Sequence, residues 1–372
     1  MYLQNLSLIN YKNYQDIELS FCEKINCFVG NNGKGKTNLL DAIHYLSFCK
    51  SYFNPTDSQN IKHGCDFFVI QGTMKRGESL DVIYCGLKRN ERKQFKLNKK
   101  EYGRLAEHIG KYPLVMISPA DSSLINEGSE ERRKYIDSVI SQFDKLYLDN
   151  LINYNKVLLQ RNTLLKYFAE NRSFDYESLE VWDSQLLQLG QKIYNTRLEF
   201  LNNFLPIFRE FFNFISGGKE IVNIEYQSQL NEDNYQLLFN EALQRDRIVQ
   251  YTTVGIHKDD LNFKIESYPL KKLGSQGQQK SFIIALKLAQ FDYTKNIKGY
   301  KPILLFDDIF DKLDNLRVKQ LMKLVSDNSF GQVFITDAHP ERIEQVFNNI
   351  KTELKIFEIS NGSGTEKVYR DC

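Results

Sequence analysis

The N-terminal third of the chain shows two hydrophobic patterns that are typical of strands. Residues 3–9 and 17–21 alternate apolar and polar side chains, which indicates strands with one buried face. Residues 25–29 form an uninterrupted apolar run, as expected of a strand covered on both faces. Apolar residues at helical spacing follow this run, at Leu39, Ile43 and Leu46. Further strands are expected over residues 67–73, 80–87 and 114–117.

Helical periodicity dominates the middle of the chain. Between Ser129 and Leu205 there is no proline and only one glycine, Gly190. Apolar side chains recur there every three or four residues, first from Ile136 to Leu158 and then from Leu179 to Phe200. The span is far longer than an ordinary globular helix, so it predicts two long amphipathic helices. A break near residues 170–173 would let them fold back as an antiparallel pair.

The C-terminal part of the chain returns to strands, at residues 222–226, 261–265 and 303–306. The polar segment that precedes residue 261 carries His257, which we interpret as a structural histidine. It also carries Asp259 and Asp260, which could cap a loop. Buried strands that alternate with helices predict an α/β fold with a parallel sheet.

Length and composition are those of an ordinary globular protein. The 372 residues are 42% hydrophobic and 26% charged, and the formal net charge is +2, so any surface for nucleic acid must be a local patch. The six cysteines include no C-x-x-C pair and indicate neither a zinc site nor a disulfide framework. No signal peptide and no apolar run of ~20 residues is found, so we expect a cytoplasmic protein without a membrane partner. The length suggests two lobes or three. We expect one lobe from both chain ends, residues 1–117 with 300–372, and a second from residues 118–299.

A phosphate-binding motif follows the apolar run at residues 25–29. The motif is Gly30-Asn31-Asn32-Gly33-Lys34-Gly35-Lys36-Thr37, which matches the P-loop pattern G-x-x-x-x-G-K-[ST]. Between a strand and a helix, this loop would direct backbone N–H groups and a helix dipole at one point, where ATP would bind. Lys36 would reach the terminal phosphates, and Thr37 would supply a hydroxyl ligand to Mg²⁺. The alternative is a glycine turn that only reverses the chain, in which case the match to the P-loop pattern would be a coincidence.

A pair of carboxylates complements the P-loop. Asp307, at the end of the apolar run 303–306, is placed to hold Mg²⁺ through water. Asp308 could orient or deprotonate the water that attacks the nucleotide. The alternative is a pair of carboxylates that only caps the next helix.

The segment at residues 274–281 predicts a second anion site. It reads Gly-Ser-Gln-Gly-Gln-Gln-Lys-Ser and precedes an apolar helix, so its serine and glycine residues form another nest of N–H groups. One chain needs only one phosphate cradle. We therefore expect Ser275, Gly277 and Gln278 to close over ATP that is held by a second copy of the chain, as the S-x-G-Q signature of ABC-type ATPases does.

Cations are concentrated between residues 88 and 104. This stretch holds eight lysines and arginines against two glutamates, and Phe95, Leu97 and Tyr102 interleave with them. One interpretation is a solvated hairpin edge, where lysines discourage pairing with another sheet. The other is a contact to the phosphate backbone of DNA. The sequence leaves both open.

The set of motifs resembles the RecF family, bacterial recombination-mediator ATPases related to the SMC proteins. The similar segments are residues 10–14, 30–38, 118–121 with Arg132 and Arg133, 253–261, 274–281 and 304–314. The resemblance implies an ABC-type ATPase head whose second lobe contains long antiparallel helices, with a D-loop at Leu313 and Asp314. It also implies dimers that form on ATP, hydrolyse it slowly and bind double-stranded, gapped or junction DNA. Such proteins act with RecR and RecO and help to load the recombinase in DNA repair, replication and the SOS response.

Three positions differ from the pattern of that family. Lys12 stands where arginine is common, which changes any stacking on adenine. In ABC-type proteins a histidine that senses the γ-phosphate usually follows this threonine directly, whereas His339 lies three residues after Thr336. His339 is therefore a candidate for that role and does not match the pattern itself. Asp121 lies roughly where the family has its Q-loop.

Two other functions share part of the motif set. The ATPase subunit of a membrane transporter has both the P-loop and the signature, but the long helical insert argues against it. A P-loop kinase that acts on a small metabolite would not need the nest at Ser275 and Gly277.

Overall fold

The computed structural model describes residues 1–218, 220–231, 234–309, 315–326, 329–348 and 352–370. The chain forms two compact units. The first unit comprises Met1–Ser122, Phe211–Lys219 and Gln276–Cys372, and the second comprises Ser123–Glu210 and Glu220–Ser275. No helix within the described ranges is long and apolar enough to cross a bilayer.

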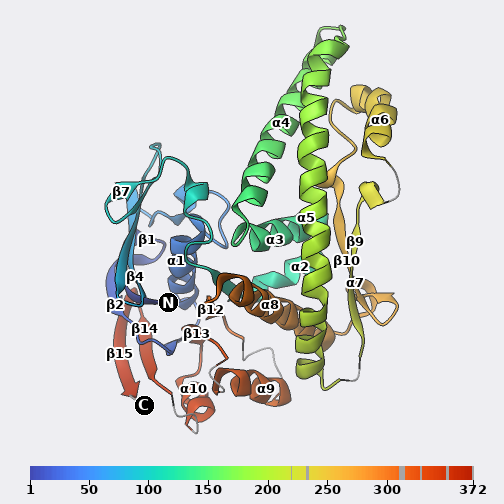
Figure 1. The fold of residues 1–372 in the computed structure, drawn as a ribbon. Coiled ribbons are helices and arrows are strands. Elements are labelled where there is room, and N and C mark those ends of the chain that lie inside the picture. Colours follow the sequence, from blue (N-terminus) through green and yellow to red (C-terminus); the bar gives the residue numbers. More distant parts are fainter. Residues whose placement is uncertain (219, 232–233, 310–314, 327–328, 349–351, 371–372) are drawn as a thin grey trace. The chain divides into compact units, whose positions relative to one another are not determined.

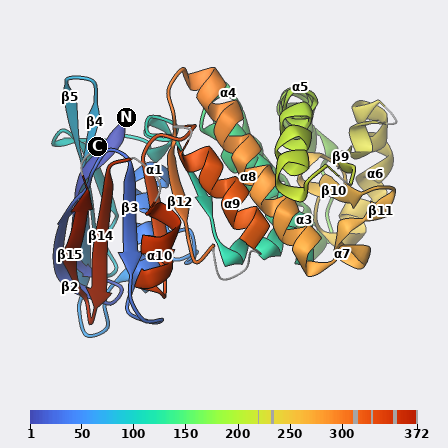
Figure 2. The same ribbon diagram turned by 90° about the horizontal axis from the view of Figure 1, so that it is seen from below.

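The first unit contains two six-stranded sheets (Figures 1 and 2). Sheet A is antiparallel, in the order β2 (Tyr14–Ser20), β1 (Tyr2–Tyr11), β4 (Phe67–Arg76), β5 (Ser79–Lys88), β6 (Gln94–Leu97) and β7 (Lys100–Glu101). Sheet B is parallel apart from its edge strand β15, in the order β15 (Ser363–Arg370), β14 (Leu354–Ser360), β3 (Ile25–Val29), β13 (Val333–Asp337), β12 (Ile303–Phe306) and β8 (Leu114–Ile117). Strands β3, β8, β12 and β13 are buried along their whole length, which confirms the predicted α/β class.

Helix α1 (Lys36–Phe48) contacts both sheets and forms one core with them. Its Leu39, Ile43 and Leu46 are fully buried, as the sequence spacing predicts. The other helices of this unit are α8 (Gln276–Lys298), α9 (Asn315–Ser326) and α10 (Pro340–Phe347). Helix α8 packs on β8, so it belongs to the first unit, whereas the sequence analysis assigned all of residues 118–299 to the second lobe. The reason is that residues 281–291 of α8 are all buried and the helix packs on the buried strand β8.

The second unit is built on a long helical hairpin. Helix α4 (Lys145–Glu170) and helix α5 (Tyr176–Ser216) are the two long helices predicted from the apolar periodicity. A further break occurs after α3 (Ser129–Ser141), where the carboxylate of Asp144 accepts a hydrogen bond from the backbone N–H of Tyr147 and caps α4. The remaining elements are α2 (Ser123–Asn126), α6 (Tyr235–Val249), α7 (Leu270–Leu273) and the sheet β11 (Tyr268–Pro269), β10 (Asp260–Ile265) and β9 (Val222–Gln227).

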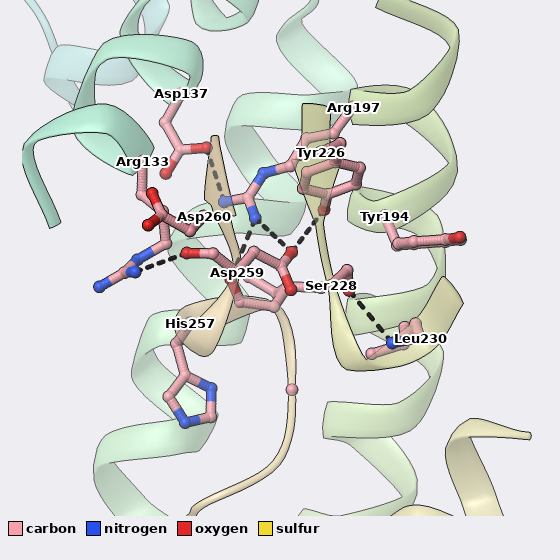
Figure 3. Close-up of polar contacts among 12 residues, drawn as sticks. Arg133, Asp137, Tyr194, Arg197, Tyr226, Ser228, Leu230, His257, Asp259 and Asp260 are labelled. Atoms are coloured by element: carbon pink, nitrogen blue, oxygen red, sulfur yellow. Dashed lines mark hydrogen bonds and ion pairs between the residues drawn. The ribbon is translucent and has the colours of Figure 1, made fainter. Parts of the chain in front are cut away.

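Two buried arginines hold the second unit together. Arg197 of α5 donates to Asp259 (2.9 Å), to Asp137 of α3 (2.8 Å) and to the backbone oxygen of Ile256 (3.0 Å), as Figure 3 shows for the first two. Arg161 of α4 donates to Asp183 of α5 and to Asp246 of α6, both at 2.6 Å.

The segment before β10 is therefore structural. His257 contacts the hydroxyl of Tyr154 (2.8 Å) and the backbone oxygen of Thr252 (3.0 Å), in agreement with the structural interpretation. Asp259 pairs with Arg197 and Asp260 with Arg132, and Oδ1 of Asp260 also accepts from the backbone N–H of Leu261 (2.7 Å), so of the two carboxylates Asp260 makes a cap-like contact to the backbone.

Gln332, one residue before β13, joins the two sheets of the first unit. Its Oε1 accepts from the backbone N–H of Leu3 (2.7 Å), and its Nε2 donates to the backbone oxygens of Leu3 and Cys22, both at 2.8 Å. The side chain is 1% exposed, so all three hydrogen bonds are shielded from water.

We expect Gln332→Leu to lower the free energy of unfolding by about 3 kcal/mol or more, because three buried backbone groups lose their partner. Urea denaturation followed by circular dichroism measures this change. Gln15→Leu, at an exposed position of β2, is the matched control and should stay within about 0.5 kcal/mol of the parent protein. Equal unfolding midpoints for the two variants would contradict the role of Gln332.

His108 gives the first unit a pH-dependent stability. Its Nε2 lies 2.7 Å from the backbone oxygen of Leu46 in α1, and its Nδ1 lies 3.1 Å from the hydroxyl of Tyr102. Burial lowers the pKa of His108 to about 4. The folded chain therefore keeps this imidazole neutral, while the unfolded chain protonates it below about pH 6.5.

The free energy of unfolding should therefore fall as the pH drops from about 6.5 to about 4, by ~1.4 kcal/mol per pH unit for this residue. His108→Gln should be less stable but should show a correspondingly flatter slope, because glutamine does not titrate. Urea midpoints measured at several pH values test this. An unchanged slope in the variant would show that His108 does not contribute to it.

Candidate nucleotide-binding site

The P-loop runs from the end of β3 to the start of α1, as the sequence predicts. Gly30 and Gly35 both have positive φ angles, +140° and +110°. A Cβ on Gly30 would lie 2.5 Å from the backbone oxygen of Ile359, and one on Gly35 would lie 2.3 Å from the side-chain nitrogen of Asn13. Glycine is therefore required at both positions for two reasons, backbone conformation and close approach.

A turn of sheet A holds this loop from outside. The hydroxyl of Tyr14 donates to the backbone oxygen of Gly35 (3.0 Å), and Nδ2 of Asn13 donates to the backbone oxygen of Lys34 (3.1 Å). Asn38 of α1 donates to Oδ1 of Asn13 (2.7 Å). These contacts give segment 10–14 a supporting role at the P-loop, which the sequence analysis did not identify.

Lys36 extends its amine across the inside of the loop. Its Nζ donates to the backbone oxygens of Gly30 (2.7 Å) and Asn31 (3.2 Å) and lies 3.4 Å from Oδ1 of Asn32. Asn31, Asn32 and Gly33 are exposed at the tip of the loop, and Lys34 donates to Asn361 (2.8 Å). The amine of Lys36 is thus held inside the loop by oxygens of residues 30–32.

Asp307 receives hydrogen bonds from three hydroxyl groups that belong to distant parts of the chain. Thr37 Oγ1 donates to its Oδ1 at 2.8 Å, Thr336 Oγ1 to its Oδ1 at 2.9 Å and Ser118 Oγ to its Oδ2 at 3.3 Å. Burial raises the pKa of Asp307, and the hydrogen bonds from Thr37 and Thr336 oppose that shift. The structure therefore brings together Thr37 and Asp307, the two residues predicted to bind the metal.

Asp308 is held in an unusual backbone conformation beside Asp307. Its φ angle is +44°, and its backbone N–H donates to Thr336 Oγ1 at 2.9 Å. Its Oδ1 is buried and has no hydrogen-bond partner in the described part of the chain. A cavity of about 130 Å³ lies next to it, lined by Ser118, Lys280, Asp307 and Asp308 among others.

This site has the chemistry of a magnesium site. A threonine hydroxyl and two carboxylates are hard oxygen ligands, which Mg²⁺ prefers, and the unpaired oxygen of Asp308 leaves acceptor capacity at its edge. Thr37 and Asp307 are the residues that could hold the ion.

The signature segment lies at the start of α8. Gly274 follows α7, Ser275 and Gln276 are exposed, and α8 begins at Gln276. Gly277 lies next to Arg317, since a Cβ there would be 3.5 Å from the guanidinium Nη1. Gln278 follows in the first turn of α8 and is partly exposed.

The three positions that differ from the family pattern have structural partners. The amine of Lys12 forms a buried ion pair with Asp41 (2.6 Å) and lies over the ring of Phe53 (5.4 Å). Asp121 pairs with Lys287 (2.7 Å) and accepts from the backbone N–H of Ser118 (2.8 Å).

His339 begins α10 and is exposed, with its backbone N–H bonded to Asp337 (2.6 Å). The predicted D-loop residues Leu313 and Asp314 lie outside the described residues.

Sequence reasoning missed two of the residues that bind Asp307. Ser118 follows β8, and Thr336 lies in β13 one residue before its end. The carboxyl ends of parallel strands meet at one edge of a sheet. Polar residues at the ends of β8, β12 and β13 could therefore have indicated, from the sequence, that Ser118 and Thr336 lie beside Asp307.

The basic stretch at residues 88–104 also divides into two kinds of cation. Lys93 is tied down by Asp57 and by the backbone oxygen of Cys49, both at 2.6 Å, and is therefore structural. Arg92, Lys99 and Lys100 are exposed.

Comparisons with known proteins cover nearly the whole chain. Residues 2–363 match the model of the RecF/RecN/SMC N terminal domain. The DNA replication and repair protein RecF of Flavobacterium johnsoniae is 53% identical over 359 residues, which cover 96% of this chain and 100% of that protein. RecF of Phocaeicola vulgatus is 50% identical and covers 99% of both chains.

Solved structures give the same result. A structure of the recombination mediator protein RecF with ATP, from the RecFOR pathway, superposes with a TM-score of 0.89 at 30% identity, covering 99% of this chain and 98% of that one. The Smc head domain of Pyrococcus furiosus has a TM-score of 0.58 at 18% identity over 99% of this chain and 96% of that one, so it shares the fold. The chain belongs to the RecF family of DNA replication and repair proteins.

Proposed function

We propose that this protein is an ATP-dependent DNA-binding protein of recombinational repair. The observation that carries the proposal is the hydrogen bond between Thr37 of the P-loop and Asp307 after β12. It links the element that would bind phosphate to the element that would bind the metal and position water. The ATP complex of the similar RecF structure supports the choice of nucleotide.

Each residue of the site has a chemical role in this proposal. The amine of Lys36 binds the terminal phosphates, and Thr37 and Asp307 hold Mg²⁺. The ion would neutralise charge on the phosphates as the terminal bond breaks. Asp308 orients the attacking water, since its Oδ1 has no partner among the described residues and its backbone N–H donates to Thr336.

A second copy of the chain completes the site. Ser275, Gly277 and Gln278 lie at the start of α8, where N–H groups at the helix N-terminus can bind the γ-phosphate of the partner's ATP. These contacts form only in the closed dimer, so ATP shifts the population toward it by differential affinity. Slow hydrolysis then acts as a timer that releases the dimer.

The dimer binds DNA at gaps or junctions, with RecR-like and RecO-like proteins, and helps to load the recombinase. The RecFOR pathway in the description of the similar structure supports this set of partners. A transporter subunit and a small-molecule kinase are less well supported, because relatives described as DNA repair proteins match the chain over nearly its full length.

Lys36→Ala should weaken ATP binding at least ~100-fold, because hydrogen bonds from an ammonium to phosphate are lost. Isothermal titration with a non-hydrolysable ATP analogue and Mg²⁺ measures this. Lys75→Ala, at a partly exposed lysine of β4, is the matched control and should bind as the parent protein does. Equal affinity of the Lys36→Ala and parent proteins would rule out the P-loop as the nucleotide site.

Ser275→Arg should leave ATP binding by the monomer intact and abolish ATP-driven dimers, because a long cation fills the nest that faces the partner's nucleotide. Sedimentation velocity with and without ATP reports the dimer. Ser79→Arg, at the exposed first residue of β5, controls for the added charge and should dimerise normally. Dimers that persist on ATP in Ser275→Arg would refute the two-copy site.

A further inference from the structure

The face of sheet A that points away from α1 carries a flat aromatic surface. We define this outer face by the outward-pointing residues Ile9, Phe67, Val69, Val82, Tyr84, Gly86, Lys88 and Lys96. The strand register places them side by side, with Ile9 opposite Val69, Val69 opposite Gly86 and Tyr84 opposite Lys96. Their neighbours along each strand point into the core, as Phe68, Ile70, Ile83 and Cys85 do.

The outer face is open and carries apolar side chains beside polar ones, since exposed Gln71 lies opposite Tyr84 and exposed Asp16 of β2 lies opposite Ile9. Phe67 is 43% exposed, and Ile9 and Val82 are each 37% exposed. Buried residues on the opposite face account for the stability of the sheet, so these exposed side chains are not needed for its core. Large apolar side chains gathered on one sheet face mark a site for a ligand or partner.

Tyr84 lies flat on this face because its neighbour is a glycine. A Cβ on Gly86 would be 2.6 Å from the hydroxyl oxygen of Tyr84 and 3.1 Å from its Cζ. The phenol ring therefore occupies the space that a side chain at residue 86 would take. Gly86 has no positive φ angle, so its lack of a side chain serves this close approach rather than a backbone requirement.

Cations lie over and beside the ring of Tyr84. The amine of Lys96, opposite Tyr84, lies over the ring, 5.5 Å from its centroid. Lys88 lies opposite Phe67, and exposed Arg89, Arg92, Lys99 and Lys100 follow in the same hairpin. Lys93 is partly buried and pairs with Asp57, and Lys88 pairs with Glu91 (2.7 Å), so residues 88–104 hold six further cations and one further glutamate, Glu101. The ligand that fits this face is therefore an anion with flat apolar groups.

We propose that the outer face of sheet A binds single-stranded DNA, with a base stacked on Tyr84 and phosphates near Lys96 and Lys88. A flat ring can stack only on a base that is not already stacked in a duplex, so the ring selects unpaired DNA. A protein partner fits less well, because lysine is depleted in the centre of protein interfaces. This inference rests on the proposed function and adds to it the part of a gapped DNA that this face recognises.

The test measures fluorescence anisotropy of labelled oligo-dT and of a labelled duplex of equal length, with the full-length protein and ATP. Tyr84→Ala should weaken oligo-dT binding about 5- to 100-fold and leave duplex binding unchanged. Tyr84→Phe should restore oligo-dT binding, since stacking needs the ring and not the hydroxyl. Equal oligo-dT affinity of Tyr84→Ala and the parent protein would overturn the inference and favour a protein partner for this face.

Gly86→Ala provides a second variant that keeps the aromatic ring. The added methyl group meets the far end of the Tyr84 side chain, which can swing away, so the protein should fold. Its oligo-dT affinity should lie between those of the parent and Tyr84→Ala proteins. An affinity equal to that of the parent protein would contradict a role for the flat ring.

A tryptophan in place of Tyr84 reports the contact directly. Bound oligo-dT should quench the emission that Tyr84→Trp adds to that of Trp182, and the duplex should not. The absence of quenching would overturn the inference.

The two proposals can fail separately. If the parent protein neither dimerises on ATP nor binds duplex, the proposed function fails. If it does both but oligo-dT binding is independent of Tyr84, only this inference fails.

Discussion

The carboxylate of Asp307 is the point on which the candidate site depends. It is buried at the end of β12, and three neutral hydroxyl groups satisfy it, those of Thr37, Ser118 and Thr336. A cation as partner would have cancelled the charge, whereas hydroxyl donors leave it available to a metal ion. Burying a carboxylate without such donors would be costly. The position of α1, the end of β8 and the end of β13 are thus fixed relative to one another by one side chain.

Sheet A matters to the site because it supports the P-loop from outside. The Tyr11–Tyr14 turn donates to the backbone oxygens of Lys34 and Gly35, which a flexible glycine-rich loop would otherwise expose to water. The ion pair between Lys12 and Asp41 ties the same turn to the buried side of α1. A preorganised loop loses less conformational entropy when phosphate binds. In this way an antiparallel sheet supports the candidate phosphate-binding loop.

In the second unit, two buried guanidinium groups lie among buried apolar side chains such as Ile140 and Phe200. Arg161 and Arg197 each bond to carboxylates on two other elements, so each specifies the angles between helices that apolar contacts would leave less defined. Removing one partner would leave a buried charge, which is strongly destabilising. The segment at residues 253–261, one of those that resemble the RecF family, owes its residue types to this packing, since Asp259 accepts from Arg197 and from the hydroxyl of Tyr226 (Figure 3).

The sequence by itself determined the P-loop, the strand before it, the carboxylates at Asp307 and Asp308, and the two long helices. Each depends on residues that are contiguous or periodic, so local chemistry reveals them. The hydroxyls on Asp307, the ion pair of Lys12 and the burial of Lys93 were decided by the tertiary structure. Their partners lie up to 270 residues apart, as Thr37 and Asp307 do, and no local pattern encodes such pairs. The same reason applies to α8, which was assigned by sequence position to one lobe but packs on a strand of the other unit.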